Sequence, residues 1–593
     1  MAVGDRDAKR QPAPFDHLER GFGAHLAAHG DRREMVELHP VSDAGHALAE
    51  RALDRPDRRL LGEPYDARGR EHGHVAGGLC DRSVFLGNDD IGGGGQAGAR
   101  RHRPTIDNPS LDRGLHRGRH RDAGADVAGA DVIEEAVLER TLHAALREGG
   151  DFAEVFAEDR RVATARLDDS KIEEFVSGRE RGAGIRVVRA DTTGYAHTAD
   201  LTEAGLLEAA TAAAAAARGT AGTAHVVALE RRPVRRSHDV SVLPETVEKA
   251  RKAEVLERAD HAARAESDSI RQVSATYADV RRRILVANSD GLLVEDDAVR
   301  TRFGVNCVAV ADTGMQTGYE APGRSIGFEY FDEVDPEEVA RIAAQRALTM
   351  LRACPAPTGK LPVVLKRGAG GVLFHEACGH GLESDLVEKD WSVFGGRVGE
   401  LVASPLVTLV DDGSYAREWG TFAIDDEGAP AQRNVLIENG VLTDYMWDLL
   451  RSRKAGRQSS GNGRRETYQH LPMVRMTNTF LLEGPDDPDA IVRDTPYGLY
   501  CVALGGGQVN TATGDFVFGI TEAYLIENGE ITEPVRAAQL IGNGPAALKL
   551  VDAVGSDFDT WAGTCGKDGQ GVPVSSGQPT LRVAELTVGG TAG

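Results

Sequence analysis

Two histidines and a glutamate stand close together in the segment GVLFHEACGHGLESD, residues 371–385. His375, Glu376 and His380 form the pattern His-Glu-x-x-x-His, one residue longer than the His-Glu-x-x-His signature of zinc peptidases. In that signature both histidines bind the metal from one face of a helix, and the glutamate serves as general base. The residue types therefore predict a hydrolytic zinc site with His375 and His380 as ligands.

The spacing of five residues requires a local change in the helix. A regular α-helix would place His375 and His380 roughly 140° apart, which is too far for one zinc ion. The helix can widen by a single π-turn, a feature often found at functional sites. Alternatively, it can end at Gly379, whose unrestricted backbone would let His380 turn back. The competing interpretation is a buried helix end in which both histidines make ordinary hydrogen bonds.

A catalytic zinc site needs a third protein ligand and one open position. Cys378 is the nearest candidate, but a third ligand on the same short helix would crowd the metal, and free cysteine is common in cores. Cys565 lies in the glycine-flanked segment AGTCGKDGQ, where Lys567 or the zinc itself would hold its thiolate. Residue chemistry thus favours Cys565 over Cys378. Cys501, in an apolar strand, is expected in the core.

Four further side chains are weaker candidates for a role at this site. Tyr468, His470 and Arg475 are candidates for stabilising an oxyanion, although a structural or substrate-contact role is the simpler interpretation. Glu383 follows the second histidine and is a candidate for orienting His380 from behind. A solvated carboxylate is the simpler expectation for Glu383.

Composition excludes several classes of protein. The net charge of -23 argues against a nucleic-acid partner. No apolar run is long enough to cross a bilayer, and the N-terminus has no apolar segment typical of a secretory signal. The 6 cysteines are scattered through 593 residues, which fits a reducing cytoplasm better than a disulfide framework.

Residues 1–130 differ from the rest of the chain. They are rich in arginine, histidine, glycine and aspartate, and contain one lysine, Lys9. No helical or strand period persists there. We interpret the segment as a disordered or non-native extension, the second through a start codon set too early, and we assign it no function.

An α+β fold is expected from about residue 131 onward. A mixed α/β N-terminal domain at 131–353 precedes a linker at 354–362 and a mostly antiparallel β domain at 363–593 that carries the metal-binding helix. Periodicity and caps predict N-terminal helices within 131–150 and at about 201–217, 244–265 and 336–351. Short strands are expected between them, in GIRVVRA, TTGYAHT, SIRQVSATYA and GVNCVAVAD.

Three local patterns make finer predictions. Asp200 and Glu203 have capping-box spacing at the start of the second helix. The Asn-Gly pairs at 439–440 and 528–529 predict type I′ hairpin turns. The segments RADTTGY and VADTGMQTGY form a weak internal echo, since each precedes a helix by a similar distance.

Five segments together resemble the TldD branch of the TldD/PmbA metalloprotease family. They are GAGGVLFHEACGHGLESD, GRQSSGNGRRETYQHLPMVRMTNTF, GGGQVNTATGDFVF, EAYLIENGEIT and GTCGKDGQGVPVSSGQPTLRV. The resemblance covers about residues 131–593. It implies that His375, His380 and Cys565 are the zinc ligands and that Glu376 is the general base. The other branch, PmbA or TldE, lacks the His-Glu-x-x-x-His helix.

The resemblance also implies an activity. It points to a cytoplasmic zinc peptidase that hydrolyses short or unstructured peptides, with a PmbA/TldE-type subunit as partner. The substrate is expected to lie as an added strand against a sheet edge. The alternative is a non-catalytic regulatory or binding subunit, whose metal is structural or which is inert without its partner.

Overall fold

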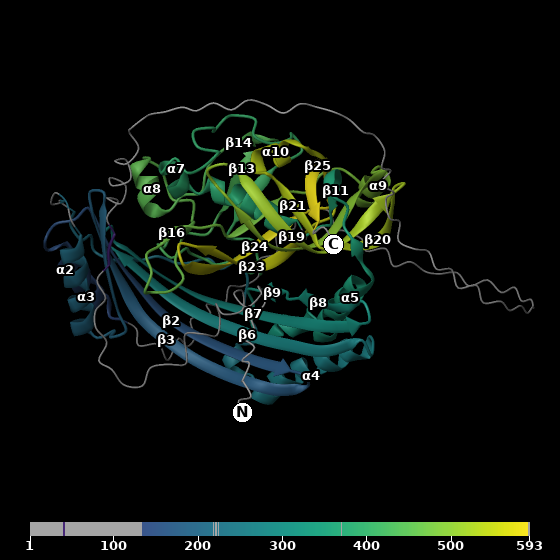
Figure 1. Cartoon of the computed structure of the whole chain (residues 1–593). Coiled ribbons are helices and arrows are strands. Elements are labelled where there is room, and N and C mark those ends of the chain that lie inside the picture. The colour runs from purple at the N-terminus through teal and green to yellow at the C-terminus, as the bar shows by residue number, and fades with distance from the viewer. Residues whose placement is uncertain are drawn as a thin grey trace, which may run out of the picture. The chain divides into compact units, whose positions relative to one another are not determined.

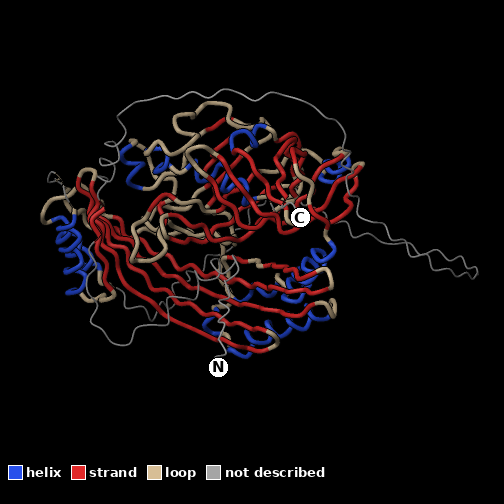
Figure 2. The backbone as a smooth tube through the Cα atoms, in the orientation of Figure 1, coloured by secondary structure: helices blue, strands red, loops and turns tan. Residues whose placement is uncertain are grey.

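The computed structural model describes residues 39–41 and 133–590, apart from residues 218, 220, 221, 223 and 369. The fold is α+β, as the sequence predicts (Figures 1 and 2). Apart from strand β1 (His39–Val41), which pairs with β4 (Thr192–Thr198), residues 1–130 lie outside the described part. The prediction for that segment therefore stays a prediction. Within the described residues, no helix has both the length and the apolar character needed to cross a membrane.

Four long antiparallel strands form the N-terminal sheet. They run in the order β3 (Lys171–Arg189), β2 (Phe152–Asp168), β6 (Ile270–Asn288) and β7 (Leu292–Ala311). Strand β4 extends the β3 edge, and β5 (Glu230–Arg231), β8 (Gly314–Glu320) and β9 (Gly323–Arg324) pair with β7. The sequence predicts much shorter strands. No helix pair covers the middle of these strands, so charged runs such as 159–161 and 281–283 occur there. The apolar alternation that predicts a strand is therefore lost at these positions.

Two helix pairs cover the two ends of one face of this sheet (Figure 1). Helices α2 (Glu135–Leu146) and α3 (Glu203–Ala216) form one pair, and α4 (Lys249–Ala265) and α5 (Pro336–Arg352) form the other. All four predicted helices are confirmed, with shifted bounds. The predicted capping box at Asp200 is wrong. The cap of α3 is Thr202, whose hydroxyl accepts the N–H of Gly205, while Asp200 accepts the N–H of Thr202.

The weak echo in the sequence corresponds to a repeated packing arrangement. Gly194 on β4 lies against α3, and Gly318 on β8 lies against α5. A Cβ added to Gly194 would lie 2.1 Å from the carbonyl oxygen of Ala213, and one added to Gly318 would lie 2.1 Å from that of Ala343. In both places strand and helix backbones touch directly, so each glycine permits one strand–helix contact of the repeat.

The C-terminal part contains a closed ring of five strands and a separate six-stranded sheet. The ring runs through β18 (Tyr497–Val509), β11 (Gly359–Leu365), β25 (Leu581–Gly590), β21 (Ala538–Asn543) and β19 (Asp515–Glu527). Strands β10 (Cys354–Pro355), β20 (Glu530–Arg536) and β22 (Val551–Val554) attach to it, and helices α9 (Pro488–Arg493) and α10 (Gly544–Lys549) lie beside it. Residues 354–362, predicted as a linker, thus contribute β10 and the start of β11.

The six-stranded sheet carries one side of the candidate site. Its order is β14 (Val441–Leu442), β13 (Arg433–Glu438), β12 (Leu409–Asp412), β17 (Asn478–Leu481), β24 (Gln570–Gln578) and β23 (Asp559–Lys567). A small hairpin of β15 (Gly463–Arg464) and β16 (Met473–Val474) and the short helix α8 (Leu449–Lys454) complete this part. Both Asn-Gly hairpins are confirmed, because Asn439, Gly440, Asn528 and Gly529 all have positive φ.

Buried ion pairs join the N-terminal sheet to the C-terminal part. Arg186 on β3 contacts Glu154 on β2 and Glu427 of the C-terminal part, each at 2.7 Å. Arg465 reaches Glu154 from the C-terminal side at 2.5 Å. All four side chains are at most 1% exposed. Each charge therefore depends on a partner from the other part of the chain.

We expect Gly194→Ala and Gly318→Ala each to destabilise the protein by about 1–3 kcal/mol, because the added methyl group overpacks a direct strand–helix contact. Chemical denaturation measures the effect. Gly506→Ala is the matched control, since a Cβ at Gly506 would meet nothing within 4 Å. Equal stability of all three variants would contradict the role assigned to these contacts.

Candidate metal centre

The segment that carries both histidines is a helix with one wide turn. It begins as α6 (Gly371–Phe374), continues as a π-turn over His375–Gly379, and ends in a 3₁₀ turn over His380–Leu382 before α7 (Ser384–Glu388). The N–H of His380 donates to the carbonyl of His375, five residues earlier. One turn therefore holds five residues, and the two imidazoles come to lie with ring centroids 5.1 Å apart. Of the two geometries considered, the chain adopts the π-turn.

Gly379 serves the site through its size and not through an unusual backbone angle. Its φ of -54° and ψ of -54° are helical, so the helix does not end there. A Cβ at this position would lie 2.2 Å from the sulfur of Met476. Gly379 thus lets the wide turn pack directly against the segment that precedes β17.

Cys565 reaches the histidines from a distant hairpin. It lies on β23, which pairs with β24 in an unbroken antiparallel register. Its Sγ is 3.5 Å from Nε2 of His380, and one ligand atom each from His375, His380 and Cys565 lie within 4.8 Å of one another. All three residues are buried. The structure thus brings together the three side chains that the sequence favours as ligands, and it leaves their role as ligands a proposal.

The three side chains interact strongly as charges. Burial alone would raise the pKa of the Cys565 thiol, but the imidazoles of His380 and His375 outweigh it and hold that pKa well below its usual value. Burial likewise opposes charge on His380, yet Cys565 and Glu383 hold its pKa well above the usual value. The centre therefore favours a thiolate, which is the form of cysteine that binds metals.

The donor set fits a zinc ion. Tetrahedral bonds of about 2.0–2.1 Å to nitrogen and 2.3 Å to sulfur would place a nitrogen and a sulfur ligand about 3.6 Å apart. The Sγ···Nε2 separation of 3.5 Å between Cys565 and His380 agrees with that value. Nδ1 of His375 is buried and has no hydrogen-bond partner in the described part of the chain, which is costly unless a further group satisfies it.

Glu376 lies beside this cluster without joining it. Its Oε2 is 3.8 Å from Nε2 of His380, and its side chain is 20% exposed, compared with 11% for His380. The carboxylate is therefore close to the ligand atoms and also reachable by water and substrate. This position suits a general base.

Glu383 is not the solvated carboxylate that the sequence suggested. It is completely buried, and its Oε2 lies 3.0 Å from Nδ1 of His380 and 2.9 Å from Nζ of Lys567. Burial would raise the pKa of Glu383, but Lys567 and His380 lower it to about 2. Because the Nδ1–H of His380 donates to this carboxylate, Nε2 is left free to bind a metal.

The other cysteines near the site belong to the core. The Cys378 thiol is fully buried, donates to the carbonyl of Phe374 at 3.0 Å, and belongs to the C-terminal core cluster. Burial raises the pKa of the Cys378 thiol to about 12. Cys501 lies in the same core cluster. Both cysteines pack as small apolar side chains.

The three oxyanion candidates have different surroundings. Tyr468 packs against the N-terminal sheet, where its carbonyl accepts the hydroxyl of Tyr195 and its ring lies 6.0 Å from that of His197. His470 contacts the hydroxyl of Thr467 at 2.9 Å. Arg475 is fully buried and donates to the carbonyl oxygen of Cys565. Arg475 therefore holds the backbone of a candidate ligand.

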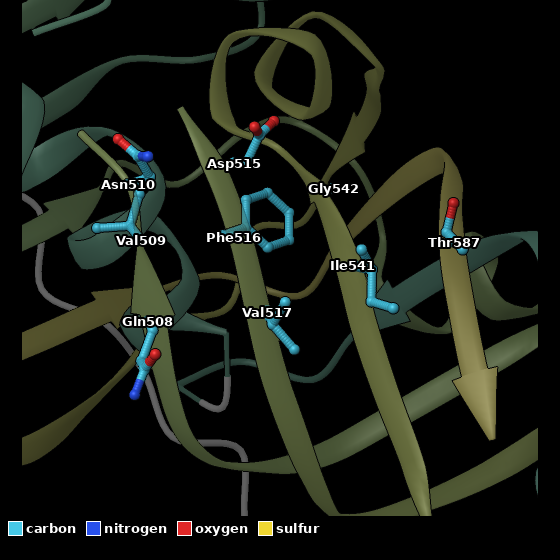
Figure 3. A pocket seen from close by; sticks show the side chains of 9 residues that line it. All are labelled: Gln508, Val509, Asn510, Asp515, Phe516, Val517, Ile541, Gly542 and Thr587. Atoms are coloured by element: carbon cyan, nitrogen blue, oxygen red, sulfur yellow. The ribbon is translucent and has the colours of Figure 1, made fainter. Parts of the chain in front are cut away.

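A surface hollow of about 520 Å³ lies elsewhere, among β18, β19, β21 and β25 (Figure 3). Asp515 is the one carboxylate among its lining residues, and its oxygens accept hydrogen bonds from Thr513 and Asn543. None of its lining residues belongs to the histidine and cysteine cluster. The hollow lacks the ligand and acid–base groups found at the cluster.

Three family models match successive parts of the chain. Their descriptions are PmbA/TldA metallopeptidase domain 1 for residues 153–217, central domain for residues 243–351, and C-terminal domain for residues 358–590. The candidate centre lies within the C-terminal match.

Curated relatives support the same assignment. A protein of Haemophilus influenzae named "Metalloprotease TldD homolog" is 39% identical over 454 residues, which cover 74% of this chain and 93% of the relative. A protein of Saccharolobus solfataricus named "Zinc metalloprotease TldD homolog" is 32% identical over 264 residues, which cover 44% of this chain and 58% of the relative.

Solved structures share the fold. A putative modulator of DNA gyrase from Thermotoga maritima matches with a TM-score of 0.65 at 21% identity, covering 77% of this chain and 100% of that one. TldE from Thermococcus kodakarensis matches with a TM-score of 0.64 at 20% identity, with the same coverage.

Replacing Cys565 by serine should weaken zinc binding by more than about 100-fold, because loss of a ligand costs more than loss of an outer partner, which is worth about 10- to 100-fold. Cys378→Ser is the matched control and should bind zinc as the wild type does. Competition with a chelator measures both affinities. Weaker binding by the Cys378 variant alone would transfer the ligand role to Cys378.

Proposed function

Since the chain belongs to the PmbA/TldD metallopeptidase family, we propose that it is a zinc-dependent peptidase that hydrolyses short or unstructured peptides. One observation carries the proposal: the meeting of His375, His380 and Cys565 within 4.8 Å, with the carboxylate of Glu376 beside them. Zinc is the proposed ion because this donor set suits it, and the name of the Saccharolobus relative includes it.

Each side chain of the centre has a distinct task in this proposal. His375, His380 and Cys565 hold the ion, which supplies the Lewis acidity that makes water nucleophilic near neutral pH. Glu376 takes a proton from the attacking water and delivers it to the leaving amine of the peptide. Glu383 keeps the Nδ1 proton of His380 in place, so that Nε2 faces the ion.

The free edge of β23 is the proposed docking site for the substrate backbone. Strand β23 pairs with β24 on one side, and no described strand pairs with its other side. On β24, Gly571 donates its backbone N–H to Glu466, and Ser575 donates its backbone N–H to the carbonyl of Thr477. The backbone N–H groups of these two residues therefore point away from β23. The residues opposite them on β23 therefore direct their backbone N–H and C=O groups outward, away from β24.

This alternation leaves usable backbone groups next to Cys565. Thr564 lies opposite Pro573, which has no N–H to give, and Gly566 lies opposite Gly571. Both Thr564 and Gly566 are exposed. By the alternation of the antiparallel ladder, their N–H and C=O groups would face the open edge. A peptide added there as a strand would run beside the metal centre, whereas a folded protein offers few unpaired extended segments. The edge thus supports the proposed preference for unstructured peptides.

A related PmbA/TldE-type subunit is the proposed partner, and the cytoplasm is the proposed location. The partner proposal is supported by the fold that the chain shares with TldE of Thermococcus kodakarensis. The alternative is that the chain is a non-catalytic subunit with a structural metal, or is inert without the partner. Peptide hydrolysis assayed with and without that subunit separates these cases.

We expect Glu376→Gln to bind zinc normally and to lower kcat for peptide hydrolysis by about 10²–10⁴-fold, because a general base contributes that much. Zinc content and kcat are measured on the same preparation. Glu400→Gln is the matched control, since Glu400 is 58% exposed and pairs with Arg397. Unchanged hydrolysis by the Glu376 variant would refute its role.

A series of peptides that each carry one N-methylated backbone amide tests the docking site. Methylation at alternate residues should lower kcat/KM by about tenfold or more, since strand pairing uses every second N–H. Side-chain replacement by alanine at the same positions should have smaller effects. Losses without a two-residue period would show that the substrate does not pair with an edge strand.

A further inference from the structure

Lys567 connects the two parts of the metal centre. It lies on β23 two residues after Cys565, on the same face of the strand. Its ammonium group donates to Glu383 at 2.9 Å, to Asp385 at 2.8 Å and to the carbonyl of Val474 at 3.1 Å. Three donor hydrogens thus meet three acceptors, so the ammonium group is fully satisfied.

The acceptors belong to the segment that carries His380. Glu383 directly follows the 3₁₀ turn His380–Leu382 and accepts a hydrogen bond from Nδ1 of His380 at 3.0 Å, and Asp385 lies in α7. Side-chain exposure is 8% for Lys567, 0% for Glu383 and 5% for Asp385. A buried charge without its partner is costly, so the hairpin and the helix resist separation at this point.

The contacts of Lys567 favour a structural role. From the sequence, a cation near Cys565 could act by stabilising the thiolate. The structure instead gives all three contacts of the ammonium group to two carboxylates and a carbonyl oxygen.

We propose that Lys567 is a positioning residue that clips the Cys565 hairpin to the segment carrying His380. The proposal rests on the zinc centre of the proposed function. His375 and His380 share one turn and stay together by local structure, whereas Cys565 is 185 residues from His380 and lies on an edge strand. The clip fixes the third ligand at the distance from His380 that a zinc ion requires.

Metal binding by Lys567→Met tests the clip directly. The full-length variant should bind zinc about 10- to 100-fold more weakly than the wild type, as is typical when an outer-shell partner is lost. Substitution with cobalt gives a second readout, because a thiolate ligand produces a charge-transfer band that histidine ligands do not. The band should weaken in the variant, since Cys565 is the ligand released.

A second variant covers the case in which Lys567→Met fails to fold. The double variant Lys567→Met/Asp385→Asn removes the clip together with the negative charge of Asp385, so the net charge of the site does not change. Circular dichroism establishes that it is folded before metal is added. It should show the same loss of zinc affinity and of the thiolate band.

Lys360→Met is the matched control. Lys360 pairs with Glu585 at 2.8 Å on the surface, with 68% of its side chain exposed. It should keep both the zinc affinity and the thiolate band of the wild type. An equal loss in this control would overturn the clip.

Two further results decide between the proposals. If the wild type shows the thiolate band and the folded Lys567 variants keep it with zinc affinity within about threefold, the clip is wrong while the zinc centre stands. If the wild type binds neither zinc nor cobalt, alone or with its partner subunit, the proposed function fails and the clip fails with it.

Discussion

The hydrogen bond from His380 to the carbonyl of His375 is the constraint on which the candidate centre depends. It closes a turn of five residues and brings two imidazoles into register that a regular α-helix would separate. The turn must also fit its surroundings, and Gly379 permits this by leaving space for the sulfur of Met476. The π-turn, the glycine at position 379 and the packing of the neighbouring segment are therefore needed together to form the candidate centre.

Features with a local signal could be predicted from the sequence. The four N-terminal helices follow from apolar periodicity, and the two Asn-Gly turns follow from the need for positive φ. The histidine pair and Cys565 could be singled out because metal ligands are few in kind and their chemistry is restrictive. The echo around Gly194 and Gly318 was visible as well, but its cause, direct contact between strand and helix, requires coordinates.

Several features that depend on contacts between distant residues could not be predicted. The long strands are interrupted in sequence by charged runs, because different faces are covered by helices, by the C-terminal part or by solvent. The sequence predicts a solvated carboxylate at Glu383, whereas the structure shows that it is buried and contacts His380. Lys567 and Asp385 are 182 residues apart, and no local pattern links them. The predicted capping box at Asp200 is wrong because the cap lies two residues later, at Thr202.

The buried ion pairs between Arg186, Glu154, Glu427 and Arg465 make the N-terminal and C-terminal parts of the chain depend on each other. A cut at residues 354–362 looks harmless because the segment is short and rich in proline. Separation of the two fragments would nevertheless take Glu427 from Arg186 and Arg465 from Glu154, so each of these charges would lose a partner. Neither half is a self-sufficient module in this respect. The N-terminal and C-terminal parts therefore stabilise each other, and the boundary between them in the sequence does not separate two independent domains.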